Sequence, residues 1–126
     1  IRDCLLSRGL GDVYKRQAVE QPRTVQETRF DVIVANLPYI ADGEELAPEV
    51  MRDPHTALFG GPQGWEIIER FLSQARDYLT ENGFVALEIG HDQAAAVTRI
   101  MDGCGYNHME VLKDMSGISR FPFAYR

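Results

Sequence analysis

Residues 30–40, FDVIVANLPYI, form the most informative stretch of the chain. The run from Phe30 to Ala35 is short and apolar apart from one acid, which is typical of a buried parallel strand. It ends in Asn-Leu-Pro-Tyr at residues 36–39, which combines a planar amide, a stiff backbone and a flat aromatic face. This combination indicates a site that grips another planar, polar group. The simpler alternative is an Asx-type turn that closes the strand with its tyrosine packed inward.

Composition narrows the possible classes of protein. The chain has 126 residues, which allows at most one domain with a modest core. Its net charge of −6 disfavours direct nucleic-acid binding, because neutralising phosphates requires a basic face. No apolar stretch approaches the ~20 residues of a membrane-spanning helix, so no membrane association is expected. Cys4 and Cys104 are far apart and the three histidines form no ligand pattern, so we expect a cytoplasmic setting and no metal site.

The first 17 residues, IRDCLLSRGLGDVYKRQ, differ in character from the rest of the chain. Their closing DVYKRQ resembles translated adapter sequence of the kind that contaminates assembled environmental reads. We therefore expect residues 1–17 to be a non-native leader and residues 18–126 to carry the domain. Gly9-Leu10-Gly11-Asp12 could suggest a glycine loop that binds a cofactor. We reject that interpretation because the segment follows no strand and opens no helical pattern.

Downstream, helical and strand-like periods alternate along the chain. Residues 36–64 are rich in proline, glycine and acids, and we expect a long functional loop there, with at most one turn of helix. Asn82-Gly83 is expected to end the first helix in a left-handed stop, and Asp92 to cap the second. The predicted helices are residues 65–81 and a segment from Asp92 to Gly103–Gly105, and the further strands are residues 84–89, 109–112 and 120–125.

This order of elements predicts parallel pairing through right-handed crossovers, with a hairpin at the end. Pro122 cannot donate to a ladder, so we expect it at a sheet edge, a strand start or a bulge. Two helices cannot cover both faces of a doubly wound sheet. The prediction is therefore an α/β fold, namely the C-terminal half of a doubly wound Rossmann-like domain with a mostly parallel sheet and a terminal antiparallel hairpin.

An ordered series of motifs points to one family. Asn36-Leu37-Pro38-Tyr39 after a strand is similar to the Asn-Pro-Pro-Tyr-type motif of S-adenosylmethionine-dependent methyltransferases that modify planar nitrogens. With later segments, it resembles the release-factor glutamine methyltransferases, also called HemK-type, over roughly residues 30–126. These segments are Pro54-His55-Thr56-Ala57-Leu58, Gly60-Gly61-x-x-Gly64, Leu87-Glu88-Ile89-Gly90 and KDMSGISRF at residues 113–121.

The resemblance implies an activity, a cofactor and a partner. The activity is methylation of the side-chain amide nitrogen of a glutamine in peptide chain release factors, with S-adenosylmethionine as the methyl donor. Asn36, Leu37, Pro38 and Tyr39 would bind the glutamine. Asn36, Pro38 and Tyr39 would be catalytic, and Asn36 would also lie close to the donor. Residues 18–126 would be a partial methyltransferase catalytic domain that lacks the donor-binding glycine loop.

The chemistry explains why such a site needs these residues. A carboxamide nitrogen is a poor nucleophile, but its two N–H groups can be held by two acceptors. The Asn36 side-chain oxygen is one acceptor, and the Leu37 backbone carbonyl, which Pro38 aims, is the other. Tyr39 can lie against the flat face of the bound amide. Leu37 departs from the commoner pattern of the family, where proline is usual, but leucine keeps the carbonyl.

Other functions stay open on the sequence alone. Asn-Leu-Pro-Tyr also occurs in ribosomal RNA adenine dimethyltransferases, which continue with Asn where this chain has Ile40. Adenine amino groups of RNA or DNA, and glutamine of a ribosomal protein, are therefore alternative substrates. From another class, the chain could be a non-catalytic fragment or an acidic interaction module. Glu88 ends a strand near the expected site, where it could face the substrate or brace a loop.

Overall fold

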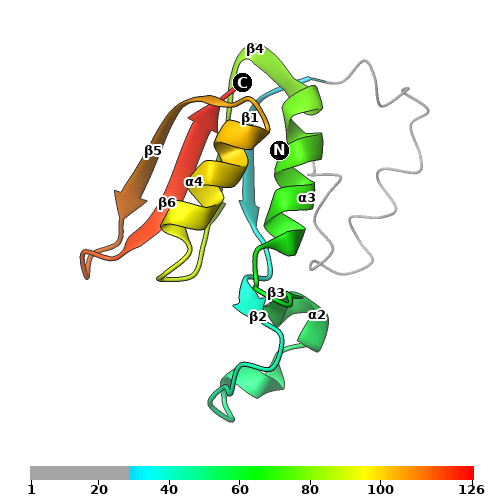
Figure 1. Cartoon of the computed structure of the whole chain (residues 1–126), viewed down its shortest axis with the longest axis vertical. Helices are drawn as coiled ribbons and strands as arrows, with labels where there is room; N and C mark the ends of the chain where they lie inside the picture. Colours follow the sequence, from blue (N-terminus) through cyan, green and yellow to red (C-terminus); the bar gives the residue numbers. More distant parts are fainter. Residues whose placement is uncertain (1–28) are drawn as a thin grey trace, which may run out of the picture.

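The FDVIVAN run forms strand β1 (Phe30–Asn36) in a computed structural model that describes residues 29–126 (Figure 1). The predicted strand is present, but the expectation that it is buried is wrong within these residues: only Ile33 of β1 is buried, and Val32 and Val34 are exposed. β1 pairs in parallel with β4 (Leu79–Glu88), and Asn36 lies opposite Glu88 where the pairing ends. Parallel strands bring their carboxyl ends to the same edge of a sheet. The motif at the end of β1 therefore begins beside the end of β4.

Four strands form the main sheet in the order β1-β4-β6-β5, with β5 at Asn107–Lys113 and β6 at Ser119–Tyr125. β6 is antiparallel to both of its neighbours, so β1, β4 and β5 share one direction and β6 alone opposes them. The predicted mostly parallel sheet with a terminal antiparallel hairpin is confirmed. The last strand of the hairpin is inserted between β4 and β5.

The prediction that Pro122 lies at a sheet edge, a strand start or a bulge is wrong. It lies inside β6, opposite Val111 of β5, and its side chain is fully buried. The ladder between β6 and β4 ends at Phe123, and the next bond runs from the Ile89 N–H to the Arg120 carbonyl at 3.0 Å. The ladder to β4 is thus interrupted beside the proline, which is how a residue without an N–H fits into a central strand.

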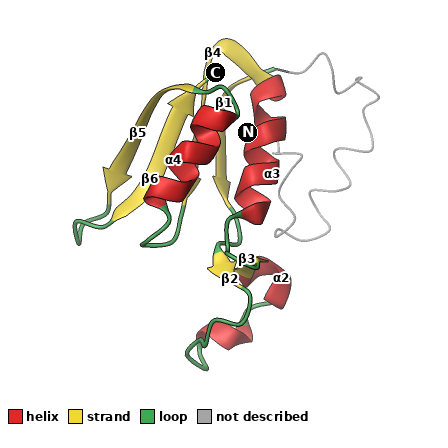
Figure 2. Ribbon diagram, viewed as in Figure 1, coloured by secondary structure: helices red, strands yellow, loops and turns green. Residues whose placement is uncertain are grey.

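Two helices, α3 (Glu66–Ala75) and α4 (Ala94–Gly103), cover one face of this sheet (Figure 2). The apolar residues that recur at helical spacing in them, such as Ile68, Leu72 and Val97, are buried, and alternate residues of β4, such as Val85 and Leu87, are buried beneath them. Within residues 29–126 no element covers the opposite face, and Val34 is exposed there. The buried apolar core consists of Ile33, Leu37, Ile68, Phe71, Leu72, Ala75, Leu79, Val85, Leu87, Ile89, Val97, Met101, Tyr106 and Ala124.

The first helix ends earlier than predicted. α3 stops at Ala75, and a 3₁₀ turn, Arg76–Tyr78, leads directly into β4. Gly83 is not a left-handed helix stop but part of β4, in a region where the register with β1 shifts. A Cβ at Gly83 would lie 2.9 Å from the Phe30 carbonyl oxygen, so the glycine allows close approach of two strands.

Residues 40–64, predicted as part of a long loop, form a small protrusion with a sheet of its own, closed by a hydrogen bond from the Gly64 N–H to the Gly61 carbonyl (Figure 1). Its two strands pair in parallel, with Ile40 opposite Phe59 and Ala41 opposite Gly61. Strands of two and three residues show no period in a sequence, so the loop prediction missed them. The elements of the protrusion are β2 (Ile40–Ala41), a 3₁₀ turn (Val50–Arg52), α2 (His55–Leu58) and β3 (Phe59–Gly61).

Two further observations concern the described part of the chain. No helix within residues 29–126 is long and apolar enough to cross a membrane. The same residues contain no group of three or more His, Cys, Asp or Glu side chains that could hold a metal ion. The predicted leader, residues 1–17, and its glycine segment lie outside the described residues.

Candidate functional site

Asn36 is oriented by Glu88 at the point where β1 and β4 end. Its Nδ2 donates a hydrogen bond to Glu88 Oε2 at 3.5 Å. A carboxylate can only accept hydrogen bonds, so Glu88 selects the NH₂ side of the Asn36 amide. The Oδ1 of this exposed side chain is thereby turned away from Glu88 as an acceptor. This contact is of the bracing kind, which is one of the two roles open to Glu88.

Leu37 anchors the segment to the core. Its side chain is 8% exposed and belongs to the same apolar cluster as Ile33 of β1. Within residues 29–126, no donor hydrogen-bonds the Leu37 carbonyl oxygen. The departure from the usual proline therefore adds an apolar anchor and leaves the backbone carbonyl available as the second predicted acceptor.

Tyr39 is held through its backbone by a residue that the sequence analysis missed. The Tyr39 carbonyl accepts a hydrogen bond from Gln93 Nε2 at 2.7 Å, while its ring packs partly buried against the core. Gln93 Oε1 accepts from the Gly90 N–H at 2.9 Å. α4 begins after Gln93 without a side-chain cap, so the predicted Asp92 cap is wrong. The sequence carries no signal for this role, because both partners of the Gln93 amide are backbone groups.

The glycines of the Gly60-Gly61-x-x-Gly64 motif let the protrusion reach the backbone of the Asn-Leu-Pro-Tyr segment. A Cβ on Gly60 would lie 2.5 Å from the Pro38 carbonyl oxygen. One on Gly64 would lie 2.5 Å from the Tyr39 carbonyl oxygen, and Gly64 has a φ of 87°. Any side chain at these two positions would therefore push the segment out of place.

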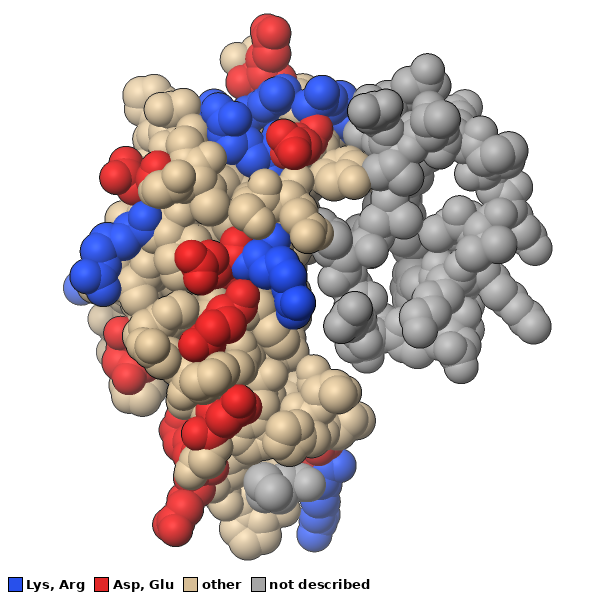
Figure 3. All heavy atoms as spheres, turned by 45° about the vertical axis from the view of Figure 1, so that its right-hand side comes forward, with Lys and Arg blue, Asp and Glu red and all other residues tan. Residues whose placement is uncertain are grey.

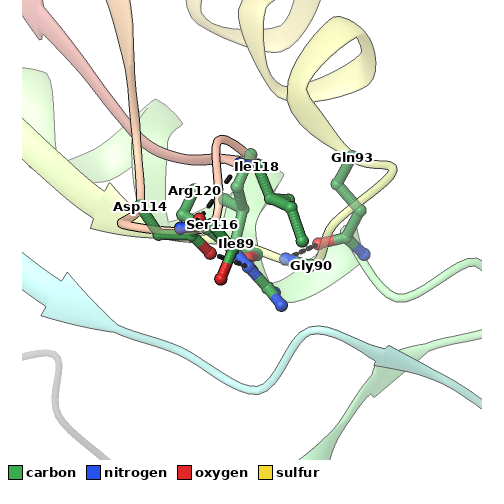
Figure 4. A network of polar contacts seen from close by, with 7 residues as sticks. All are labelled: Ile89, Gly90, Gln93, Asp114, Ser116, Ile118 and Arg120. Atoms are coloured by element: carbon green, nitrogen blue, oxygen red, sulfur yellow. Dashed lines mark hydrogen bonds and ion pairs between the residues drawn. The ribbon is translucent and has the colours of Figure 1, made fainter.

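Arg120 of β6 supports the end of β4 from the other side (Figure 4). Its Nη1 donates to the Ile89 carbonyl at 3.0 Å, and its Nε lies 3.6 Å from Asp114 Oδ2. Asp114 Oδ1 also accepts the N–H groups of Ser116 and Ile118, at 2.8 and 3.0 Å. The bond from Ile118 above all, with that from Ser116 and the charge of Arg120, holds the pKa of Asp114 below its usual value. The C-terminal motif thus braces the strand end that carries Glu88.

The protrusion beside the site is acidic. Figure 3 shows acidic side chains along this part of the surface. Its exposed charged side chains are Asp42, Glu44, Glu45, Glu49 and Asp53, against Arg52 alone. A surface of this sign repels phosphates.

The sheet, its helices and the polar segment at the strand ends define the class of protein: a Rossmann-like α/β fold with a polar site where β1 and β4 end. All four predicted site residues lie together at the ends of β1 and β4, with the Leu37 side chain turned into the core. Glu88 and Gln93 join them through hydrogen bonds.

Comparison with known proteins identifies the relatives, although no family model matches the chain. The release factor glutamine methyltransferase of Aquifex aeolicus is 39% identical over 104 residues, which cover 81% of this chain and 37% of the relative. That of Thermodesulfovibrio yellowstonii is 40% identical over 98 residues, covering 75% of this chain and 35% of the relative. The chain therefore spans about a third of the length of these curated relatives.

Solved structures give the same result. The crystal structure of the protein-(glutamine-N5) methyltransferase (release factor-specific) from Alicyclobacillus acidocaldarius matches with a TM-score of 0.51 and 25% identity. The match covers 78% of this chain and 49% of that one. The predicted resemblance to the release-factor glutamine methyltransferases and the predicted fold class are both confirmed.

Proposed function

We propose that residues 29–126 form the substrate side of an S-adenosylmethionine-dependent methyltransferase that modifies a glutamine side-chain amide in a peptide chain release factor. The observation that carries the proposal is a pair of acceptors at the end of β1. These are Asn36 Oδ1, oriented by Glu88, and the Leu37 backbone carbonyl. Two acceptors on adjacent residues match the two N–H groups of one carboxamide. The names of the relatives supply the release factor as the partner.

The segment would act by positioning and by stabilising the transition state. Asn36 and Leu37 would each accept one N–H of the substrate amide and so fix its plane. Pro38 disfavours the helical region at Leu37 and thereby aims its carbonyl, and Tyr39 would cover the flat face of the amide. Positioning of this kind supplies up to roughly 7–11 kcal/mol of a barrier. As the nitrogen attacks, its N–H groups become more acidic and their hydrogen bonds strengthen, which stabilises the transition state selectively.

The residues at the strand ends also fit the reactive end of the methyl donor. S-adenosylmethionine supplies an activated methyl group on a positively charged sulfonium, so the protein needs no strong base. The Glu88 carboxylate and the Asn36 amide oxygen place negative charge at this rim of the sheet. Asn36 is therefore the proposed contact to both the donor and the substrate.

An adenine amino group is the second candidate to receive the methyl group, because it presents the same planar pair of N–H groups to the two hydrogen-bond acceptors. The acidic protrusion disfavours it, since phosphates would approach a surface of like charge. We therefore propose a protein substrate without direct nucleic-acid contact, and a cytoplasmic location for the reaction. Glutamine of a ribosomal protein is the alternative within the same chemistry.

The proposal is tested in a chimera that joins the part of the Aquifex aeolicus relative preceding the matched region to residues 29–126 of this chain. The chimera is incubated with S-adenosyl-[methyl-³H]methionine and with either a release factor, a ribosomal protein fraction or RNA. We expect label on a glutamine of the release factor, located by mass spectrometry. Label on adenine alone would select the nucleic-acid alternative. A folded chimera that labels none of them would leave the non-catalytic interaction module.

Within this chimera, Asn36→Ala should lower methyl transfer about 100-fold or more, because one of the two acceptors for the amide is lost. Asn82→Ala is the matched control, since Asn82 is an exposed amide elsewhere on β4. The control should transfer methyl groups at the unchanged rate. Near-native turnover by Asn36→Ala would remove Asn36 from the site.

A further inference from the structure

Gln93 is, tyrosine aside, the only buried polar side chain within residues 29–126, with 4% of its surface exposed. Both ends of its amide are hydrogen-bonded to backbone. Oε1 accepts from the Gly90 N–H, as Figure 4 shows, and Nε2 donates to the Tyr39 carbonyl. A buried amide destabilises a fold unless its polar atoms are paired. Gln93 makes two short hydrogen bonds to two separate loops, so we expect its role to be the connection of these loops.

These bonds join the two loops that carry the site. Gly90 follows Glu88 by two residues, and Tyr39 follows Asn36 by three. The Asn36–Glu88 contact connects the loops at one end, and Gln93 connects them at the other. The two proposed acceptors, the Leu37 carbonyl and Asn36 Oδ1, belong to the residues between these two connections.

The protrusion closes the remaining side of the Gln93–Tyr39 bond. A Cβ added to Gly64 would lie 2.9 Å from Gln93 Nε2 and 2.5 Å from the Tyr39 carbonyl oxygen. The backbone of Gly64 is thus packed directly on the bond, and the Tyr39 carbonyl has no space to turn towards the protrusion. Without the donor at Gln93, this part-buried carbonyl would lose its hydrogen-bond partner, and the segment would lose one of its two connections.

We propose that Gln93 is a positioning residue of the site, an inference that rests on the proposed function. By fixing the Tyr39 carbonyl, Gln93 keeps Asn36 Oδ1 and the Leu37 carbonyl in a constant relation to each other. Two acceptors can hold both N–H groups of one carboxamide only while that relation is kept. Gln93 therefore acts on the substrate through the backbone of residues 36–39.

The test uses the full 126-residue chain and the variant Gln93→Glu. Glutamate keeps an acceptor for the Gly90 N–H but presents an acceptor, in place of a donor, to the Tyr39 carbonyl. Gln74→Glu makes the same change at an exposed position of α3 and serves as the matched control. Circular dichroism establishes that each variant is folded.

The first measurement is ¹⁵N relaxation of the Leu37, Tyr39 and Ile40 amides. In the unchanged chain and in Gln74→Glu we expect order parameters of about 0.85, and in Gln93→Glu a fall to about 0.6 or below. Val85 in β4 should remain rigid in all three proteins. Rigid Tyr39 and Ile40 amides in Gln93→Glu would overturn the proposal.

The second measurement titrates each protein with N-acetylglutamine N-methylamide and follows the Asn36 side-chain NH₂ resonances. Binding should weaken about tenfold or more in Gln93→Glu and stay unchanged in Gln74→Glu. Equal binding by Gln93→Glu and the unchanged chain overturns the positioning role alone. Absence of binding by the unchanged chain counts against the proposed function, and the relaxation data then still decide whether Gln93 fixes the segment.

A second variant covers the case in which Gln93→Glu does not fold. Gln93→Met has a similar volume and no charge, and it removes both hydrogen bonds without burying a carboxylate. The same two measurements apply to it, with the same expected results. Unfolding of both variants would overturn the proposal in favour of a purely structural role.

Discussion

The segment Asn36–Tyr39 lies between two regions that are held together by different forces. On one side, the sheet and its two helices bury a continuous apolar core that includes Leu37. On the other side, none of the side chains described in residues 40–64 belongs to that core or packs against it. The protrusion is held by the pairing of β2 with β3, by glycine contacts and by the stacking of His55 on Phe59, with ring centroids 4.3 Å apart.

The difference in buried apolar contacts predicts which side of the site is fixed and which can move. We call these two sides the fixed wall and the movable wall. Regions with few buried apolar contacts open at a lower free energy than the core of the same protein. A site that admits the side chain of another protein needs one wall that holds the acceptors and one that can give way. The sheet, with Leu37 and Gln93, is expected to be the fixed wall, and the protrusion is expected to be the movable one.

The largest effect in this comparison is expected from leucine truncation in the fixed wall. Leu72→Ala removes a fully buried side chain from α3 and should lower the free energy of unfolding by about 2–5 kcal/mol. Leu46→Ala makes the same change in the protrusion, where the side chain is half-buried, and should lower it by less than about 1 kcal/mol. Urea unfolding followed by circular dichroism measures both. Equal losses would show that the two regions share one core.

A smaller effect is expected from glycine substitution in the contact between the regions. Gly43 and Gly64 have nearly the same left-handed backbone, with φ of 85° and 87°, so alanine at either position is strained by about 1–2 kcal/mol. A Cβ at Gly43 meets nothing within 4 Å, whereas one at Gly64 would collide with the Tyr39 carbonyl oxygen. Gly64→Ala should therefore destabilise the protein more than Gly43→Ala and shift the Tyr39 and Ile40 amide resonances.

The matched backbone angles make this pair informative. The difference between the two free energies of unfolding, from parallel urea titrations, isolates the contact of the protrusion with the segment Asn36–Tyr39. If Gly43→Ala and Gly64→Ala are equally destabilising and leave the Tyr39 resonances in place, the protrusion does not press on the segment.

The fixed wall could largely be predicted from the sequence, and the movable one could not. Ile68 and Leu72 of α3 recur at the helical period, and Val85 and Leu87 of β4 alternate, because each side faces one continuous core. The contacts of the protrusion involve backbone groups of residues far apart in the chain, such as Ile40 with Phe59. Backbone pairing leaves no period in the side chains, so β2 and β3 could be predicted only as parts of a loop.

The residues of the candidate site also differ in how well the sequence predicts them. Asn36 and Tyr39 could be located because they form a compact motif at the end of a strand. Gln93 could not, because the group to which it donates is a backbone carbonyl 54 residues away. A glutamine at the start of a helix carries no sign of such a partner. The sequence instead predicts a cap at the adjacent Asp92, because aspartate is favoured at the N-cap of a helix.

The smallest effect is expected at Asp114, which supports the fixed wall through Arg120. Its pKa is lowered chiefly by the Ile118 N–H, with contributions from Ser116 and Arg120. A carboxyl group whose pKa is lower in the folded state stabilises the fold above its unfolded pKa of about 3.9. That contribution is lost as the pH falls through the folded pKa. Asp114→Asn should therefore slightly lower the free energy of unfolding at about pH 7 and leave it unchanged at about pH 2.

The pH dependence of the free energy of unfolding distinguishes the effect of the Asp114 charge from that of its hydrogen bonds within the turn. Asparagine keeps an Oδ1 acceptor for the Ser116 and Ile118 N–H groups, so the turn can keep its hydrogen bonds while the attraction to Arg120 is lost. Urea unfolding of both proteins across the acid range should give free energies that converge as the pH falls. Asp92→Asn, with the same change in net charge at an exposed turn, serves as the control. A gap that persists at low pH would mean that the geometry of the turn, and not the charge of the carboxylate, supports the end of β4.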